Sequence, residues 1–160
     1  MTADILSAHL PGDRVRPLLE AAEDADGIAA FSESFVQGLD DERVRHTHFL
    51  VEDGGDVVAC AGLAEDGSAE LVVHPDFRRK GIGEALARKV RAESPDTGLW
   101  AHGNLAGAKA LAAKLGLSVS RELLVMGISA DDIPSGGPEL PGGFEALDYV
   151  GAVELSLIHI

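Results

Sequence analysis

The chain has 160 residues, 46% of them hydrophobic and 25% charged, which is typical of a globular domain with its own core. Its formal net charge of −14 argues against nucleic acid or an anionic membrane as a partner, because both attract basic surfaces. The sequence has neither an apolar run of the ~18 residues that a membrane span needs nor a signal-peptide pattern at its start.

The first half of the chain predicts two helices followed by three strands. Residues 13–39 read as two short helices with a break at Asp26 and Gly27. The segments "HTHFLVED", "DVVACAGLAE" and "SAELVVHP" read as strands, and the "DGG" and "EDGS" between them are typical hairpin turns. Cys60 lies in the second strand and is expected to be a small buried core residue rather than a nucleophile. A single cysteine excludes an internal disulfide framework and favours a cytoplasmic location.

The second half predicts helices alternating with strands. From Gly81 the apolar residues recur at helical spacing, and this helix is expected to end before Pro95. "TGLWAHG" reads as a strand, and Asn104 is placed to cap a further helix that Gly116 closes. Residues 117–129, "LSVSRELLVMGIS", read as a last strand. The order ααβββαβαβ predicts an α/β (α+β) fold in which helices flank a central mixed sheet.

The composition of the sequence changes near its end. Residues 131–143, "DDIPSGGPELPGG", are rich in proline and glycine and read as a linker after a domain of residues 1–130. Residues 144–160 are too few to fold alone and are expected to be the truncated start of a second domain. The apolar ending at residues 155–160, "LSLIHI", is similar to a translated sequencing-adapter tail, so we expect a fragment of a longer protein.

Positive charge is concentrated at the start of the helix that follows Gly81. Six of the 13 Lys and Arg residues of the chain fall within the fourteen residues from Arg78 to Arg91. Backbone N–H groups at a helix start have no intrahelical partner, and the helix dipole makes that end positive. Gly81 and Gly83 let an anion approach those groups closely. The stretch therefore predicts a pyrophosphate site, the alternative being an ordinary turn with a solvated basic rim.

Two common phosphate motifs do not fit these glycines. A P-loop requires Lys and Ser or Thr after its second glycine, and a dinucleotide fingerprint requires a third glycine where this chain has Leu86. The stretch from Arg78 to Gly83 does fit R-x-x-G-x-G, and with the preceding "LVVHPDFR" it resembles the acetyl-CoA loop of GNAT-family N-acetyltransferases. The resemblance covers residues 1–130 and implies the GNAT fold, with a mostly antiparallel sheet.

The GNAT resemblance assigns acetyl-CoA contacts residue by residue. The strand before the loop pairs its backbone with the pantetheine arm, as if with another strand. The contacts that the resemblance implies are Leu71, Val72 and Val73 for the pantetheine, and Arg79, Lys80, Gly81, Ile82, Gly83 and Glu84 for the pyrophosphate. Glu84 would act through its backbone N–H, because its carboxylate would repel phosphate.

The sequence offers no clear catalytic residue. In many GNAT enzymes a tyrosine on the helix after the fifth strand protonates the leaving thiolate, but this chain has Ala112 at that position. Glu70 and Glu65 are candidate bases, although each also reads as a solvated strand-end carboxylate. His102 ends a strand near the expected acetyl site, and it reads either as a ligand contact or as an ordinary strand-end histidine.

The remaining histidines and Asn104 read as structural residues. His74 precedes Pro75 and reads as a turn residue rather than a base. His46 and His48 share a strand face, but no third ligand stands at a suitable spacing, so we expect no metal. Asn104 is first of all a helix cap, with a cofactor contact as the alternative.

Three longer stretches make the GNAT resemblance more specific. "LWAHGNLAGAKALAAKLGL", "RELLVMGISADDIP" and "LPGGFEAL" are similar to the N-terminal half of the actinobacterial mycothiol synthase family. That family fuses two GNAT domains and acetylates the cysteinyl amine of cysteinyl-glucosaminyl-inositol. The resemblance implies that this half holds acetyl-CoA, that the C-terminal half performs transfer, and that Glu33 contacts the thiol-sugar substrate. The alternative for Glu33 is a helix-surface glutamate.

The resemblance also implies a monomer in which this half works with its own C-terminal GNAT half. Two other functions stay open. One is a free-standing GNAT enzyme that acts on another amine, and the other is a non-catalytic domain that binds acetyl-CoA.

Overall fold

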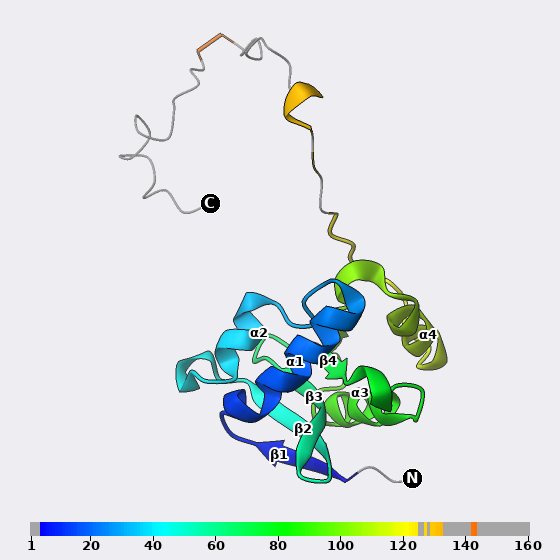
Figure 1. Cartoon of the computed structure of the whole chain (residues 1–160). Helices are drawn as coiled ribbons and strands as arrows, with labels where there is room; N and C mark the ends of the chain where they lie inside the picture. Colours follow the sequence, from blue (N-terminus) through cyan, green and yellow to red (C-terminus); the bar gives the residue numbers. More distant parts are fainter. Residues whose placement is uncertain (1–3, 125–126, 128, 133–141, 144–160) are drawn as a thin grey trace. The chain divides into compact units, whose positions relative to one another are not determined.

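A computed structural model describes residues 4–124, 127, 129–132 and 142–143 (Figure 1). Residues Met1–Val119 form one compact unit, and Ser120–Ile160 form a second. Within the described part of the second unit, the one regular element is a single 3₁₀ turn at Ala130–Asp132. The predicted linker and second-domain start, residues 131–143 and 144–160, lie almost wholly outside the described residues.

The first unit is a five-stranded sheet in the order β1-β2-β3-β4-β5. The strands are β1 (Ile5–Ala8), β2 (Thr47–Asp53), β3 (Asp56–Leu63), β4 (Ser68–Val73) and β5 (Gly98–Leu99). Neighbouring strands from β1 to β4 are antiparallel, whereas β5 runs parallel to β4. The predicted fold class is confirmed: a mixed, mostly antiparallel sheet with helices on both faces.

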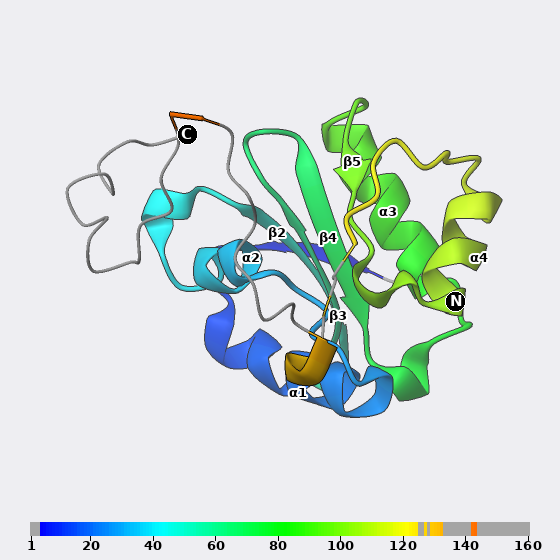
Figure 2. The same ribbon diagram turned by 90° about the horizontal axis from the view of Figure 1, so that it is seen from above.

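Four helices flank the sheet. They are α1 (Gly12–Asp26), α2 (Glu33–Gly38), α3 (Ile82–Glu93) and α4 (Ala106–Lys114). The end-on view in Figure 2 shows α1 and α2 on one side of the sheet and α3 and α4 on the other. Within the described residues no helix is both long enough and apolar enough to cross a membrane.

Alternation along the strands builds one core on each face of the sheet. Toward α1 and α2, the row Leu50, Cys60 and Val72 packs against helix residues that include Leu18 and Phe35. The opposite face contributes Phe49, Ala59, Ala61 and Ala69 to a cluster with Leu86 and Val90 of α3. Cys60 has no exposed surface, and burial raises the pKa of its thiol to about 12, so it is the inert core residue that the sequence predicted.

Several local signals for turns and helix ends are confirmed. Gly54 and Gly55 both have positive φ, at 61° and 98°, as a tight hairpin between twisted strands requires. α1 ends at Gly27 in the left-handed conformation, which is the predicted break between the first two helices. Gly116 has φ 66°, and the N–H of Leu117 returns to the carbonyl of Ala112, so α4 closes as predicted.

Four expectations were wrong in detail. The order ααβββαβαβ lacks the short edge strand β1, which precedes the first helix. Of the strand predicted over residues 97–103, only Gly98–Leu99 pairs. Residues 117–124, the part of the predicted last strand that is fully described, form no strand. Asn104 does not cap α4, because α4 begins at Ala106 with Leu105 as its N-cap, and Asn104 itself has φ 52°.

Candidate acetyl-CoA site

Strands β4 and β5 separate immediately after they meet. Their pairing covers Ser68 with Gly98 and Ala69 with Leu99, and the last bond runs from the N–H of Trp100 to the carbonyl of Ala69 at 2.9 Å. Since the carbonyls of Gly67 and Ala69 face β5, alternation turns the backbone of Leu71 and Val73 to the same side. Beyond Ala69, no strand among the described residues pairs with that side of β4.

The three predicted pantetheine residues therefore differ in orientation. Val72 is paired with Cys60 of β3, and its side chain is buried in the core on the α1 side. Leu71 and Val73 present their backbone groups to the opened edge, although the Val73 carbonyl already accepts a bond from Nε of Arg78 at 3.0 Å. Leu71 keeps both backbone groups on this edge. The geometry therefore favours Leu71 and Val73 over Val72 as strand-like contacts.

A chain reversal connects this edge to the start of α3. His74 begins this reversal. It acts as the predicted turn residue, because its Nδ1 accepts a hydrogen bond from the N–H of Asp76 at 3.3 Å. Arg79 has φ 63° and Gly81 has φ 86°, so two left-handed residues turn the chain into the helix. A Cβ at Gly81 would meet no atom within 4 Å, so the preference for glycine at this position comes from the backbone conformation.

The first turn of α3 leaves three N–H groups without intrahelical partners. The first intrahelical bond runs from the N–H of Ala85 to the carbonyl of Gly81 at 3.0 Å. Ile82, Gly83 and Glu84 precede it, so their N–H groups lie at the positive end of the helix dipole. A Cβ on Gly83 would lie 3.5 Å from Val73 and 3.7 Å from Leu111, which places this glycine between the β4 edge and α4.

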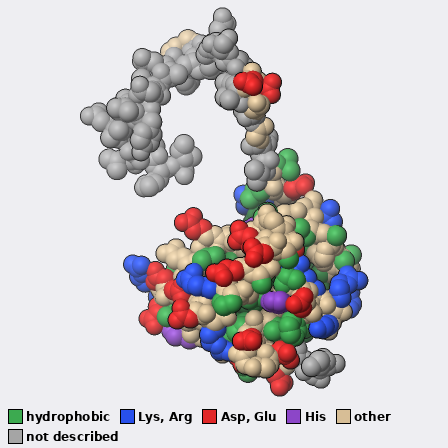
Figure 3. Space-filling model, in the orientation of Figure 1, with side chains coloured by type: hydrophobic (Ala, Val, Ile, Leu, Met, Phe, Trp, Pro, Cys, Tyr) green, Lys and Arg blue, Asp and Glu red, His purple; other side chains and the backbone are tan. Residues whose placement is uncertain are grey.

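The basic residues around the turn divide into two groups. Arg78 makes two bonds to the carboxylate of Asp26, at 2.7 and 2.8 Å, so it is a structural residue rather than a charge at the rim. Arg79 is exposed and makes no ion pair with any described residue, and the ammonium of Lys80 lies 4.4 Å from the ring centre of Phe77. Figure 3 shows that Lys and Arg side chains gather on the side of the domain that carries α3.

The carboxylate of Glu84 is held by neighbouring cations. Lys114 of α4 and Arg88 of α3 contact it at 2.5 and 2.9 Å. These two partners lower the pKa of Glu84, with Lys114 the larger cause, so the group stays ionised and neutralised. An anion at the helix start thus meets the Glu84 N–H without facing an unpaired carboxylate.

The two candidate bases differ sharply in burial. Glu65 is exposed and lies 3.5 Å from Arg45, as expected for a solvated carboxylate. Glu70 is only 3% exposed, which contradicts the same expectation for that residue. Its Oε2 accepts the N–H of Ser32 at 2.7 Å, and its Oε1 lies 3.0 Å from Nε2 of His102. That second contact suits an ion pair when His102 is protonated, although the ring N–H is not aligned for a hydrogen bond.

The remaining residues that the sequence singled out are found as follows. Glu33 is exposed in the first turn of α2, next to Ser32. Ala112 lies on α4, and its methyl side chain cannot donate a proton. His46 and His48 are edge-to-face at 6.1 Å, and no group of three metal-ligating side chains forms among the described residues. Sequence reasoning missed the burial of Glu70 and its contact with the partly exposed His102, because both depend on elements far apart in the chain.

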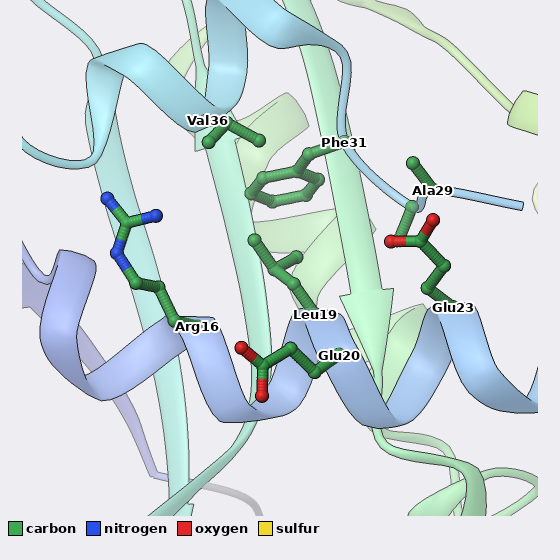
Figure 4. Close-up of a pocket in the computed structure, with 8 residues that line it drawn as sticks. Arg16, Leu19, Glu20, Glu23, Ala29, Phe31 and Val36 are labelled. Carbon is green, nitrogen blue, oxygen red and sulfur yellow. The ribbon is translucent and has the colours of Figure 1, made fainter.

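Two pockets of the domain lie away from the opened edge of β4. One, of about 190 Å³, lies between α1 and α2 and is lined by Leu19, Phe31 and Val36, with Arg16, Glu20 and Glu23 at its rim (Figure 4). A second, of about 380 Å³, lies near His74 and Phe77 at the β2–β3 hairpin. Neither pocket is lined by a predicted acetyl-CoA contact.

Comparison with known proteins agrees with this geometry. Residues 45–116 match the model of the acetyltransferase (GNAT) domain. The fold is similar to an aminoglycoside N-acetyltransferase solved with CoA, with TM-score 0.53 and 15% identity over 79% of this chain and 99% of the other. It is also similar to the ribosomal-protein-S18-alanine N-acetyltransferase of Escherichia coli, with TM-score 0.52 and 24% identity over 72% and 77% of the two chains.

Curated relatives match over most of this chain. The mycothiol acetyltransferase of Corynebacterium diphtheriae is 43% identical over 89% of this chain and 47% of its own length. That of Mycolicibacterium vanbaalenii is 44% identical over 78% and 43%. The chain thus spans less than half the length of these relatives. It therefore carries a GNAT acetyltransferase domain, and its matched relatives are mycothiol acetyltransferases.

Proposed function

We propose that this chain is the acetyl-CoA-binding half of an N-acetyltransferase. The observation that carries the proposal is the opening between β4 and β5 after Ala69, which leads directly to the N–H groups at the start of α3. A strand-like pantetheine arm would pair with Leu71 and Val73. Its pyrophosphate would lie at Gly81, Ile82, Gly83 and Glu84, with Arg79 and Lys80 supplying positive charge.

The acceptor that we propose is the cysteinyl amine of cysteinyl-glucosaminyl-inositol. Support comes from the name of the curated relatives and from the exposed Glu33, whose carboxylate is available to an ammonium or to sugar hydroxyls. Acetyl transfer forms the amide bond, breaks the thioester, and leaves the amine proton and the thiolate to be managed by acid and base groups. In this half Ala112 replaces the expected acid, so we assign transfer to the remaining half of a longer, monomeric, cytoplasmic protein.

The proposal is tested by measuring acetyl transfer with this chain alone and with a full-length relative. We expect the 160-residue chain to bind acetyl-CoA and to acetylate cysteinyl-glucosaminyl-inositol at least a hundredfold more slowly than the full-length enzyme. Equal rates would assign transfer to this half and favour a free-standing enzyme. A full-length protein that binds acetyl-CoA without turnover would favour a non-catalytic binding domain.

A further inference from the structure

One buried carboxylate connects two loops that are far apart in the sequence. Glu70 projects from β4 and is 3% exposed. Its Oε2 accepts the N–H of Ser32, the N-cap of α2, at 2.7 Å. Its Oε1 lies 3.0 Å from Nε2 of His102, the first residue of the turn between β5 and α4. Glu70 thus contacts both the residue that precedes α2 and a residue that follows β5.

The packing around Glu70 fixes both loops against the sheet. Gly62 is the cross-strand partner of Glu70, and a Cβ there would lie 2.8 Å from the ring of Phe35, so α2 packs closely over this position. A Cβ on Gly103 would lie 2.9 Å from Ile28, so the α1–α2 loop and the β5–α4 turn are also in direct contact. These contacts leave little space for Glu70 to change its partners.

We propose that Glu70 is a positioning residue for the acceptor site. Its bond to Ser32 sets the start of α2, and therefore the place of Glu33, relative to the opened edge of β4. A carboxylate whose two oxygens are both engaged by the protein is suited to holding geometry, because removing it leaves the half-buried Ser32 N–H without its hydrogen-bond partner. The inference rests on the proposed function, since it takes Glu33 as an acceptor contact.

The test compares Glu70→Gln with Glu70→Ala, with Glu65→Ala as the exposed control. Glutamine keeps an oxygen for the Ser32 N–H and offers an amide donor to His102, whereas alanine keeps neither. We expect the Ser32 amide to exchange with solvent at least tenfold faster in Glu70→Ala, and within threefold of wild type in Glu70→Gln and Glu65→Ala. Hydrogen exchange of the 160-residue chain, followed by NMR, measures this directly.

The functional readout is calorimetric affinity for two probes, acetyl-CoA and cysteinyl-glucosaminyl-inositol, with CoA present for the second. Glu70→Ala should weaken acceptor binding about tenfold and leave acetyl-CoA affinity within twofold, and Glu70→Gln should restore acceptor binding. Glu33→Gln should weaken acceptor binding in the wild-type background but much less in Glu70→Ala, because the two residues act through one geometry.

The possible failures are distinguishable. Unchanged Ser32 exchange or unchanged acceptor affinity in Glu70→Ala would overturn the positioning role. Loss of acceptor binding in Glu70→Gln equal to that in Glu70→Ala would also overturn it, because charge rather than geometry would then be required. If Glu70→Ala does not fold, Glu70→Gln is compared with the wild type instead, and acceptor binding lost in that folded variant would overturn the positioning role. Wild-type protein that binds acetyl-CoA but not the acceptor would overturn the inference and the acceptor contact of Glu33, but not the acetyl-CoA-binding role. Failure to bind acetyl-CoA would refute that role.

Discussion

Arg78 and Asp26 form a two-bond ion pair that ties the last residue of α1 to the turn before α3. Nη1 and Nη2 of Arg78 lie 2.7 and 2.8 Å from the two carboxylate oxygens, and Nε donates to the Val73 carbonyl at 3.0 Å. One side chain thus holds the end of β4, the turn and the end of α1 together. The turn that presents the N–H groups of α3 is therefore fixed by a residue that is itself unavailable to phosphate.

Substitution of Arg78 and of Arg79 should separate stability from binding. Arg78→Ala removes three bonds of a half-buried guanidinium, so we expect the free energy of unfolding to fall by about 2 kcal/mol. Arg79→Ala removes an exposed cation with no described ion-pair partner, so stability should change by less than about 0.5 kcal/mol. Its acetyl-CoA affinity should nevertheless fall severalfold. Urea unfolding and calorimetry measure the two effects, and a destabilised Arg79→Ala would contradict this division.

Two substitutions of Gly81 separate the effect of charge at the start of α3 from the effect of the backbone conformation. Gly81→Asp and Gly81→Asn place side chains of equal size at φ 86°, and both residue types tolerate the left-handed region better than most. Asp puts an anion where the pyrophosphate is proposed to lie, whereas Asn does not. We expect Gly81→Asp to abolish measurable acetyl-CoA binding and Gly81→Asn to weaken it far less. Equal affinities in the two variants would refute the site.

His48 should make the domain sensitive to acid. Burial, followed by the neighbouring His46 and His9, lowers the pKa of His48 to about 4, whereas the unfolded chain titrates it near 6.5. Between these values the unfolded state binds more protons than the folded state, so stability is lost as the pH falls from about 6.5 to 4. The loss attributable to His48 is on the order of 3 kcal/mol. Urea unfolding from pH 7.5 to 4.5 measures this loss. The free energy of unfolding should fall less steeply with decreasing pH in His48→Gln than in the wild type, and an equal pH dependence would contradict the role of His48.

Gly62 tests how closely α2 packs over the sheet. A methyl group there would lie 2.8 and 3.1 Å from two ring carbons of Phe35, which is 4% exposed. Gly62→Ala should therefore lower the free energy of unfolding by about 1–3 kcal/mol by overpacking the core. Gly107→Ala is the matched control, because a Cβ there meets no atom within 4 Å. Denaturation of both variants checks the expectation, and equal stabilities would show that α2 can move aside.

Local chemistry explains what the sequence predicted correctly. Gly54 and Gly55 at the hairpin, Gly27 after α1 and Gly81 before α3 each occupy backbone conformations that glycine favours, so their neighbours were enough to place them. The anion site predicted at the α3 start follows from the same local chemistry, whereas its assignment to acetyl-CoA comes from the GNAT resemblance. The structure adds the opened β4 edge beside it.

Long-range packing explains what the sequence did not reveal. Strand β1 is four residues long at the sheet edge, too short for alternation to identify it. Glu70 reads as a strand-end carboxylate, but α2 packs over its neighbour Gly62 and buries it. Asn104 is a residue type that caps helices, yet Gly103 packs against Ile28 and the helix begins two residues later. Each difference arises from contacts between elements distant in the sequence.

The central claim is that the opened β4 edge and the start of α3 bind acetyl-CoA. Calorimetric titration of the ligand-depleted 160-residue chain with acetyl-CoA tests it most directly. The account predicts saturable one-to-one binding that Gly81→Asp abolishes. Absence of binding by the folded wild-type chain, or binding that survives Gly81→Asp, would contradict it.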